Sequence, residues 1–422
     1  MMSKTYLKRV IDQKLSLYLQ TFGAVLIEGP KWCGKTTTAS IYAKSTLKMQ
    51  DPSQLRNNLQ IADAAPQLLL KGATPRLIDE WQIAPVLWNT IRSYIDESQA
   101  SGQFILTGST TPPNDSNRHT GTGRFGRLLM RPMSLFESLE STGEVSLKSL
   151  FEKAPFNPCK SNLNIEMIAQ LICRGGWPQS IDKPEDSALL MAREYVKAIT
   201  NEEINTPNGV VRDSIRVRSF LRAYARSIQT LTKNTTLLED MKANDISIDA
   251  ATLYAYLSAL QKIFVIEETP AWSPNIRSRT AIRTSNKKGV VDPSIAAAVL
   301  GQTKSSLLKD FELFGLLFES LCIRDLRIYS DDIDGMVSHY RDDYGLECDA
   351  VIHLNDGRYA LIEIKLGGKE EDSAAKHLLQ LESLLLSKGY PLPQFKMILT
   401  GGELGYLRND GVMVVPIGCL KP

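Results

Sequence analysis

The sequence predicts an α/β protein with a parallel-sheet core, a helical and winged-helix middle, and a second α/β domain toward the C-terminus. Three observations lead to this prediction. In the first third, short apolar runs alternate with amphipathic segments, as buried parallel strands alternate with helices. The pattern becomes mostly helical after Met133. A second alternation of strands and helices begins near Phe311.

The N-terminal third contains three apolar runs that are typical of buried parallel strands. The predicted strands are residues 23–28, 76–80 and 103–107, and the predicted helices are residues 10–19, 35–45 and 87–97. Residues 112–127 are rich in Pro, Gly, Asn and Ser and predict a loop. Strands that alternate with helices imply a parallel sheet covered on both faces.

The rest of the chain divides by its periodicity. A turn at 244–245, a helix over 248–262 and apolar strands at 263–266 and 289–291 give a winged-helix outline. A helix from 311 precedes strands at 335–340, 347–354 and 359–365, a helix at 374–386 and a strand at 396–400. The predicted domains are therefore residues 1–135 (sheet core), 136–235 (helical linker or lid), 236–305 (winged helix) and 306–422 (C-terminal α/β domain).

Composition excludes some classes of function. Acids and bases nearly balance over the 422 residues, at a net charge of +2, so bulk charge does not attract nucleic acid and only a local basic face could. The six cysteines lack metal-ligand spacing, which favours reduced thiols. The start of the sequence does not have the pattern of a signal peptide, and no apolar run approaches the roughly 20 residues of a membrane helix. We expect a cytoplasmic protein without membrane contact.

A glycine-rich motif follows the first predicted strand. Gly29, Gly34, Lys35 and Thr36 occupy the fixed positions of G-x-x-x-x-G-K-[ST], between a strand and a helix. The glycines let consecutive N–H groups face phosphates at a helix N-terminus, Lys35 reaches the β- and γ-phosphates, and Thr36 offers its hydroxyl to Mg²⁺. We predict an ATP and Mg²⁺ site. Its predicted binding residues are Gly29, Pro30, Lys31, Trp32, Cys33, Gly34, Lys35, Thr36, Thr37 and Ser109.

Polar residues end the next two strands. Asp79 follows an apolar strand and is predicted to hold Mg²⁺ with Thr36, which leaves Glu80 to polarise the attacking water. An acidic pair after a strand is otherwise often a helix cap. Thr107 and Ser109 are both candidates to sense the γ-phosphate, and a simple turn is the alternative.

Two arginines flank Phe125. Arg124 or Arg127 could stabilise charge on the transferred phosphoryl group, in the same chain or from a neighbouring subunit. Solvated surface arginines are the alternative.

The C-terminal domain carries a second polar pattern. Glu363 and Lys365 are two residues apart and project from one strand face, and the predicted hairpin brings Asp349 beside them. Asp349 and Glu363 could hold Mg²⁺ or Mn²⁺, while Lys365 positions water against a phosphodiester. Glu319 and Gln380 are possible additions from the flanking helices. A solvent-facing acid–base pair is the alternative.

These motifs carry two resemblances. The stretches GPKWCGKTT, RLIDEWQ, FILTGST, GRFGRLLMRPMSLFE, CRGGWP and VDPSIAAAVLG resemble AAA-type ATPases of bacteria and archaea with an appended DUF4143 domain. That resemblance implies an AAA, STAND-like P-loop ATPase core and a winged-helix middle. Asp349, Glu363, Ile364 and Lys365 match the PD-(D/E)xK motif, so the C-terminal domain is similar to that nuclease fold.

The middle domain leaves DNA binding open. The predicted helix over 248–262 has almost no Arg or Lys, although DNA-reading helices usually bring cations to phosphates. Basic residues gather where a wing would lie, and packing against protein is the alternative. These residues are Arg277, Arg279, Arg283, Lys287 and Lys288.

Two functions from different classes follow, and a DNA-binding scaffold without useful ATP turnover is a third hypothesis. The first is an ATP-hydrolysing, DNA-associated protein with a nuclease-like C-terminal domain. The alternative is a nucleotide-dependent regulatory switch that acts on a protein partner, with a nuclease-like fold that does not cleave. The sequence leaves the oligomeric state open.

Overall fold

The computed structural model describes residues 6–110, 120–207, 209–243, 246, 248–274 and 285–422. The chain forms two compact units. Unit 1 comprises residues 1–132, 202–211 and 258–265, and unit 2 comprises residues 133–201, 212–257 and 266–422. Each unit has its own sheet, so the predicted α/β class is confirmed. Within the described residues, no helix is long and apolar enough to span a membrane.

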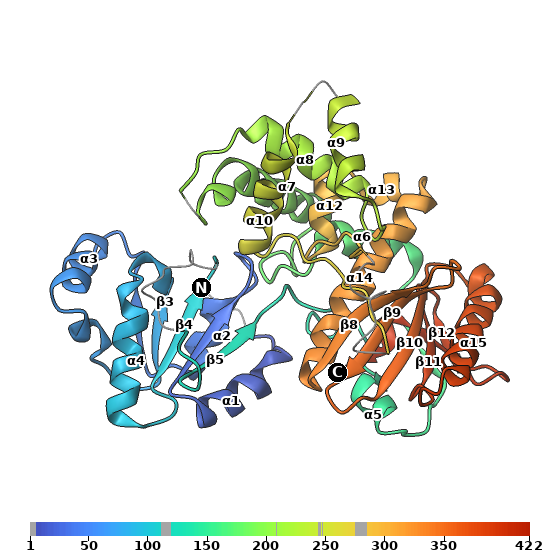
Figure 1. Ribbon diagram of the computed structural model, residues 1–422, viewed down its shortest axis with the longest axis horizontal. Helices are drawn as coiled ribbons and strands as arrows, with labels where there is room; N and C mark the ends of the chain where they lie inside the picture. The colour runs from blue at the N-terminus through green and yellow to red at the C-terminus, as the bar shows by residue number, and fades with distance from the viewer. Residues whose placement is uncertain (1–5, 111–119, 208, 244–245, 247, 275–284) are drawn as a thin grey trace. The chain divides into compact units, whose positions relative to one another are not determined.

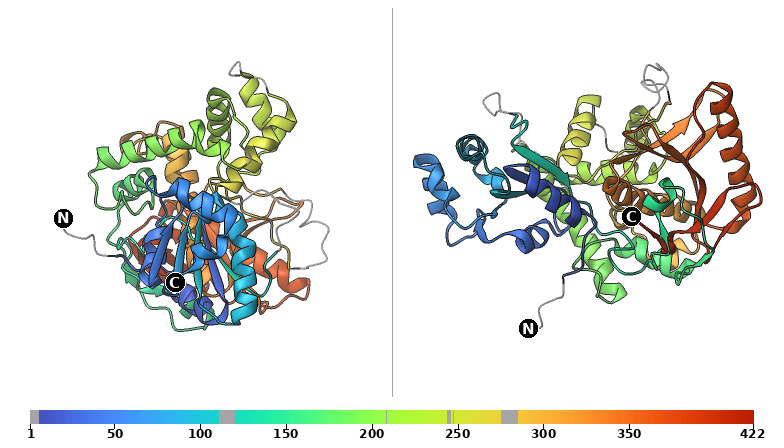
Figure 2. Two further views of the ribbon diagram at one scale, coloured as in Figure 1. Left: turned by 90° about the vertical axis from the view of Figure 1, so that its left-hand side faces the viewer. Right: turned by 90° about the horizontal axis from the view of Figure 1, so that it is seen from below.

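Unit 1 contains a five-stranded sheet in the order β2-β3-β4-β1-β5, and every pairing is parallel. Helices cover both faces (Figures 1 and 2). The strands are β1 (Ala24–Glu28), β2 (Ser45–Lys48), β3 (Arg76–Asp79), β4 (Phe104–Gly108) and β5 (Phe125–Leu129). The helices are α1 (Ile11–Thr21), α2 (Lys35–Tyr42), α3 (Leu55–Ala64) and α4 (Val86–Ser98).

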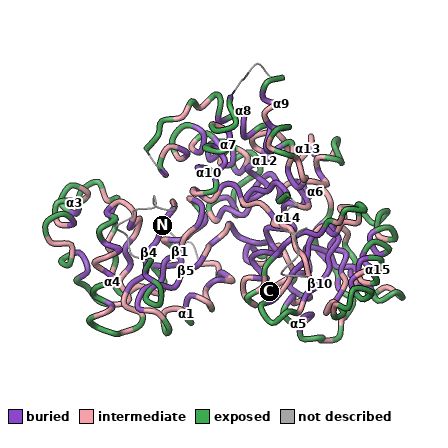
Figure 3. The backbone as a smooth tube through the Cα atoms, viewed as in Figure 1, coloured by how far each residue is buried: buried purple, intermediate pink, exposed green. Residues whose placement is uncertain are grey.

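Strand alternation divides the interior of unit 1 into two cores. Leu26 of β1 belongs to the core that contains Trp88 of α4, whereas the next residue, Ile27, belongs to the core of Leu15 and Ala39 from α1 and α2. Successive strand side chains point to opposite faces, so a fully apolar strand fills both cores. Figure 3 shows β1 and β4 mostly buried, and only Glu28 at the end of β1 is of intermediate burial. The sheet thereby holds the carboxyl ends of its strands at one edge.

Strand β5 corrects part of the loop prediction for 112–127. Of the described part, residues 125–127 belong to β5, which pairs with β1 in the register Leu26↔Arg127. Its sequence, FGRLL, interrupts the apolar run with a glycine and an arginine, so periodicity did not indicate a strand. The arginine is tolerated because β5 is an edge strand.

Unit 2 contains a seven-stranded mixed sheet in the order β7-β12-β13-β11-β10-β9-β8. Its strands are β7 (Cys159–Lys160), β8 (Gly335–Arg341), β9 (Glu347–Leu354), β10 (Tyr359–Lys365), β11 (Lys396–Thr400), β12 (Leu404–Leu407) and β13 (Met413–Pro416). Strands β8, β9 and β10 are antiparallel neighbours, and β11 runs parallel to β10 after the crossover helix α15 (Glu371–Ser387). A small parallel pair joins β6 (Val145–Ser146) to β14 (Leu420–Lys421).

Helices make up most of the remainder of unit 2. They are α5 (Leu147–Phe151), α6 (Ile165–Arg174), α7 (Glu185–Asn201), α8 (Ser214–Arg226), α9 (Asn234–Ala243), α12 (Pro293–Val299), α13 (Lys304–Leu307) and α14 (Phe311–Asp332). Helix α10 (Ala250–Lys262) has residues 250–257 in unit 2 and residues 258–262 in unit 1. Helix α14 is buried on nearly every side from Phe314 to Ser330, which is typical of a central helix.

The predicted wing strands are not present as strands. Residues 263–266 and 289–291 contribute only an isolated antiparallel bridge between Ile266 and Val290. A further bridge joins Thr269 to Lys287. These short apolar runs resemble strands by composition, but too few residues pair to build a ladder. The predicted turn at 244–245 lies outside the described residues.

A buried charge network organises unit 2. Asp292 accepts from the Arg324 guanidinium at 2.9 Å and from the Gly176 N–H at 2.9 Å, and it also caps α12 through the Ser294 N–H. Arg324 pairs in addition with Asp325, whose carboxylate accepts the Leu135 N–H. All three charged side chains are almost fully buried. The network therefore joins segments 135, 176 and 292 to α14.

This network gives CRGGWP and VDPSIAAAVLG a structural role. The indole N–H of Trp177 donates to the Ser294 hydroxyl at 2.9 Å, beside the Asp292–Gly176 hydrogen bond. Gly176 has no room for a side chain, because an added Cβ would lie 2.1 Å from the Met133 carbonyl oxygen. The two segments thus pack against each other.

Asp292→Ala should destabilise unit 2 by about 3–5 kcal/mol, because it leaves a buried guanidinium with one partner fewer and removes a helix cap. Thermal unfolding of the full chain measures the loss. Glu194→Ala is the control, since that carboxylate belongs to an exposed ion pair with Lys197 and should have little effect. Equal midpoints for both variants would contradict this role of Asp292.

Candidate functional site

The glycine-rich loop of unit 1 connects β1 to α2. Gly29 has φ of +152°, and a Cβ there would lie 2.1 Å from the Met130 carbonyl oxygen. Gly34, immediately before α2, has φ of +102°. Both positions favour glycine, because other side chains are strained at such angles. The loop geometry therefore follows directly from the spacing of the two glycines.

The Lys35 ammonium lies inside this loop. It is buried and donates to the carbonyls of Gly29 and Pro30 at 2.9 and 2.8 Å. Carbonyl oxygens are weaker partners for an ammonium than phosphate oxygens, because hydrogen bonds between two charged groups are stronger. Lys35 is thus held ready to exchange the loop carbonyls for an anion.

Arg9 supports the loop from outside the motif. Its guanidinium donates to the Cys33 carbonyl at 2.8 Å and to the Arg131 carbonyl at 2.8 Å. This ties the loop to the segment that follows β5. Arg9 was not predicted, because a lone arginine 20 residues before the motif gives no sequence signal. Lys31, a predicted binding residue, pairs with Glu203 at 2.5 Å.

Two hydroxyls converge on Asp79 at the carboxyl edge of the sheet. Thr36 Oγ1 and Thr107 Oγ1 donate to Asp79 Oδ1 at 2.7 and 2.5 Å. Parallel pairing of β3 with β4 and of β4 with β1 brings these residues together. A carboxylate and a hydroxyl are hard oxygen donors, which fits Mg²⁺ that also takes phosphate oxygens and water.

Glu80 has a strained backbone and a fixed side chain. Its φ and ψ are 56° and 50°, a left-handed conformation that costs about 1–2 kcal/mol for a residue with a side chain. The Ser109 hydroxyl donates to Glu80 Oε1 at 2.9 Å, and the Gln82 amide donates to Oε2. The Glu80 N–H also donates to Thr107 Oγ1 at 3.3 Å. Ser109, just after β4, and Gln82, just after β3, thus orient this carboxylate.

The arginine prediction needs correction for action within one chain. Arg124 immediately precedes β5 at the amino edge of the sheet, and its carbonyl accepts the Ala24 N–H. At ~3.3 Å per residue it lies about 20 Å along the strands from the glycine-rich loop. Its guanidinium pairs with Asp96 at 2.7 Å. Arg127 lies mid-strand over the Trp88 ring. Arg124 is therefore placed away from the phosphates of its own chain.

Unit 2 brings the predicted C-terminal residues together. The Lys365 ammonium lies 2.9 Å from Asp349 Oδ2 and 2.7 Å from Glu363 Oε2. The β9–β10 register pairs Ala350 with Ile362, so Asp349 and Glu363 come one residue beyond that pair. The Ile364 N–H donates to Asp349 Oδ2 at 2.9 Å. Asp349 therefore lies beside Glu363 and Lys365, as the predicted hairpin requires.

Two further charges complete this carboxylate–ammonium cluster, which consists of Lys287, Glu319, Asp349, Glu363 and Lys365. The Lys287 ammonium lies 2.8 Å from Glu319 Oε1 and 3.4 Å from Asp349 Oδ1. Gln380 is exposed on α15, and none of the hydrogen bonds between described residues joins it to the cluster. Lys287 was predicted as a wing residue, so its place in the cluster is a finding of the structure.

Burial and the neighbouring charges set the protonation of the cluster. Burial, with Asp349 adding to it, raises the pKa of Glu319 to about 7 and the pKa of Glu363 to about 8. Burial would also raise the pKa of Asp349, but the ammoniums of Lys287 and Lys365 hold it well below its ordinary value. Burial would lower the pKa of Lys287, but Glu319 and Asp349 raise it. Burial would likewise lower the pKa of Lys365, but Asp349 and Glu363 raise it, so both lysines stay charged at neutral pH.

The cluster does not fit the metal ion that its sequence pattern implied. Two ammoniums already occupy the oxygens that would face a divalent cation. In the described part of the chain, no group of three or more His, Cys, Asp or Glu side chains is arranged to hold a metal. The metal assignments to Asp349 and Glu363 are thus not supported by the geometry.

Lys287 and Lys288 also correct the predicted DNA-contacting wing. Both are buried. The Lys288 ammonium lies 2.9 Å from Glu268 Oε1 and 3.0 Å from Asn234 Oδ1. Buried, paired lysines cannot reach phosphates. Arg277, Arg279 and Arg283 lie outside the described residues.

Comparison with known families finds three matches along the chain. Residues 21–139 match the AAA domain, residues 165–306 match a domain of unknown function, DUF8612, and residues 314–420 match another, DUF4143. The chain carries an AAA domain followed by these two domains. The AAA domain supports nucleotide binding and hydrolysis, and it suggests ATP, typically with Mg²⁺, as the ligand.

Individual proteins that resemble this chain have low sequence identity to it. The uncharacterized proteins Rv2008c of Mycobacterium tuberculosis and Mb2031c of Mycobacterium bovis are each 24% identical over 97% of this chain and 83% of their own length. The solved Walker-type ATPase paby2304 of Pyrococcus abyssi is 15% identical, with a TM-score of 0.41 over 68% of this chain and 94% of that one. A RuvB variant of Thermotoga maritima is 18% identical, with a TM-score of 0.26 over 62% and 89%.

Lys35→Ala should weaken ATP binding at least about tenfold, which corresponds to about 1.4 kcal/mol, and should abolish hydrolysis, because the loop loses its buried positive charge. Binding of a fluorescent ATP analogue and phosphate release measure the two effects. Lys44→Ala removes an exposed lysine just beyond α2 and serves as the control. Normal turnover by Lys35→Ala would rule out this site.

Proposed function

We propose that this chain hydrolyses ATP at the glycine-rich loop of unit 1. The convergence of Thr36 and Thr107 on Asp79 Oδ1 beside that loop carries the proposal, because it prepares an oxygen-ligand site next to an anion-binding loop. Thr36 and Asp79 would hold Mg²⁺, which neutralises phosphate charge when it is bound. Lys35 and the backbone N–H groups of Gly29 and residues 31–37 would hold the phosphates.

Glu80 is proposed to position and polarise the attacking water. Its carboxylate receives hydrogen bonds from Ser109 and Gln82, which fix its direction. Its left-handed backbone supports a functional role, since such strain tends to persist where the site needs it. In this proposal Ser109 and Gln82 are positioning residues. Thr107 orients Asp79. Any arginine that senses the γ-phosphate would come from residues other than those at the carboxyl edge of this sheet.

Glu80→Gln should retain ATP binding and slow hydrolysis by about 100-fold or more, because the amide keeps the shape but cannot accept a proton. Steady-state phosphate release and nucleotide affinity, measured on the same preparation, separate the two effects. Glu97→Gln changes an exposed glutamate of α4 and should leave both unchanged. If Glu80→Gln turns over at the wild-type rate, another group activates the water.

For the C-terminal domain, residues 306–422, the structure favours a nuclease-like fold that does not cleave nucleic acid. The order α14-β8-β9-β10-α15-β11, with Asp349, Glu363 and Lys365 on neighbouring strands, supports the resemblance to PD-(D/E)xK nucleases. The two lysines that occupy its carboxylates favour the alternative in which this fold does not cleave. The nucleotide state of unit 1 would then regulate the binding of a partner and not the cleavage of nucleic acid.

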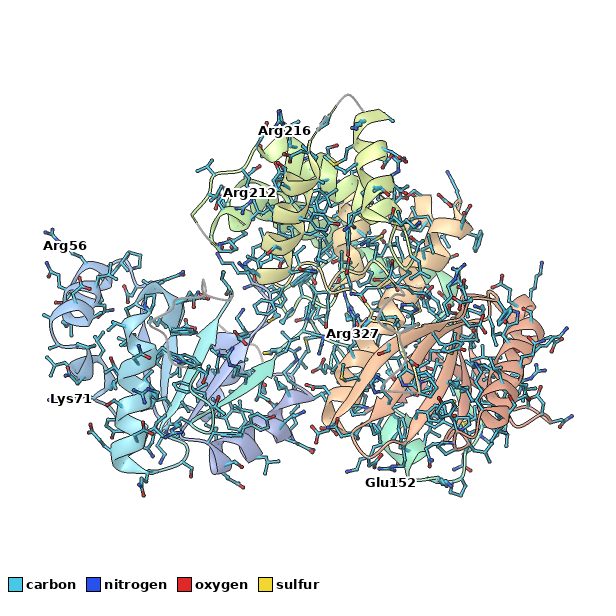
Figure 4. The ribbon with its side chains drawn as sticks, in the orientation of Figure 1. Arg56, Lys71, Glu152, Arg212, Arg216 and Arg327 are labelled. Carbon is cyan, nitrogen blue, oxygen red and sulfur yellow. The ribbon has the colours of Figure 1, made fainter. Side chains whose placement is uncertain are left out.

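DNA is the second candidate partner, and helix α8 favours it. Arg218 and Arg222 are exposed and one helical turn apart. Among the described residues, neither lies within ion-pair distance of a carboxylate, whereas Arg226 pairs with Asp240. Arg216, labelled in Figure 4, is a further exposed arginine of this helix, but it lies 3.8 Å from Asp213. Among the described arginines of this helix, only Arg218 and Arg222 therefore count here as unpaired. Unpaired arginines in a row are suited to phosphate contacts.

The double variant Arg218→Ala, Arg222→Ala should weaken DNA binding and reduce the slope of log K against log salt by about 1–2, because two phosphate contacts are lost. Fluorescence anisotropy with labelled duplex DNA at several salt concentrations measures the slope. Lys197→Ala, which removes an exposed lysine of α7, is the control. An unchanged slope, or no DNA binding by wild type, would favour a protein partner.

A further inference from the structure

The lysine at position 287 comes from a segment remote from the C-terminal sheet motif. Residue 287 lies 32 positions before Glu319 and 62 before Asp349, yet its ammonium lies 2.8 and 3.4 Å from their carboxylates. The side chain is 7% exposed, and those of Glu319 and Asp349 are 12% and 14% exposed. An ammonium this deeply placed is more than a surface ion pair.

The backbone fixes Lys287 in this place. Its N–H and C=O exchange two 3.0 Å hydrogen bonds with Thr269. Arg327 of α14, labelled in Figure 4, donates to the Thr269 hydroxyl at 2.9 Å and to the carbonyls of Glu267 and Glu268 at 3.0 Å. Helix α14 thus anchors the segment that carries Lys287, and the same helix supplies Glu319, about two turns before Arg327.

The second ammonium leaves little room for another cation. Lys365 contacts the other Asp349 oxygen and Glu363. Each oxygen of Asp349 therefore faces one lysine, and Oδ2 also accepts the Ile364 N–H. A divalent ion among these carboxylates would meet two positive charges at short range, where the repulsion is weakly screened. It could enter only if one ammonium left.

We propose that the ammonium of Lys287 takes the place of a divalent cation among Glu319, Asp349 and Glu363. The Lys287 ammonium is then the cation of this cluster, and the cluster binds neither Mg²⁺ nor Mn²⁺. Removal of that ammonium converts the cluster into a divalent-cation site. This inference is independent of ATP hydrolysis in unit 1, so each can fail alone.

Lys287→Met should create the site. In nucleotide-free full-length protein, Mn²⁺ at ten times its Kd should raise the melting temperature of the variant by about 3 °C. Lys287→Gln, which keeps an N–H donor for Glu319, provides a second variant if methionine is not tolerated. The wild type should not respond, and addition of Asp349→Asn to either variant should abolish the response.

Lys288→Met is the matched control. The neighbouring lysine is equally buried and paired, but it lies outside the cluster, so its loss should create no Mn²⁺ response. Folded Lys287 variants that ignore Mn²⁺ would overturn the proposal.

The wild type tests the proposal without any Lys287 variant. Equilibrium binding of Mn²⁺ to the wild type and to Asp349→Asn should be equal. One additional ion per wild-type chain would overturn the proposal, as would metal-dependent DNA cleavage that Asp349→Asn removes.

Discussion

Parallel pairing of β1 with β4, and of β4 with β3, is the constraint on which the nucleotide site depends. It sets the carboxyl ends of three strands side by side and so brings Thr36, Asp79 and Thr107 within hydrogen-bond distance. The strands hold this register because they are apolar on both faces and fill two separate cores. The polar site is therefore a consequence of how apolar residues pack beneath it.

Unit 2 differs from unit 1 in that it buries many charged side chains. Arg324 lies between Asp292 and Asp325, and Lys287 and Lys365 lie among three carboxylates. In both networks an internal cation satisfies acids that would be costly to bury alone. Helix α14 contributes to both, through Arg324 and Glu319. One central helix thus positions the structural network and the cluster that resembles a nuclease site.

The sequence predicted what depends on local pattern. The glycine spacing gave the loop, and the apolar runs before Asp79 and Thr107 gave the strand ends, because both signals lie within a few consecutive residues. Asp349, Glu363 and Lys365 followed from strand alternation across a short hairpin. These predictions needed no long-range information.

The errors share one physical cause, which is contact between residues distant in sequence. Arg9 supports the loop from 24 residues away, and Lys287 reaches Asp349 across 62. Neither has a local signature. Arg124 was misplaced because β5 was not recognised as a strand, so the edge of the sheet at which it lies was unknown. The apolar runs of the predicted wing had the composition of strands but no adequate partners.

The proposed nucleotide site combines a glycine-rich loop with an oxygen-ligand pair for Mg²⁺. Phosphate release from ATP by the purified full chain, measured with Mg²⁺ and again with EDTA, tests it most directly. We expect release that saturates with ATP and disappears in EDTA, since Thr36 and Asp79 complete their function only with the ion. Absence of release at every ATP concentration with Mg²⁺, or equal release in EDTA, would contradict the account.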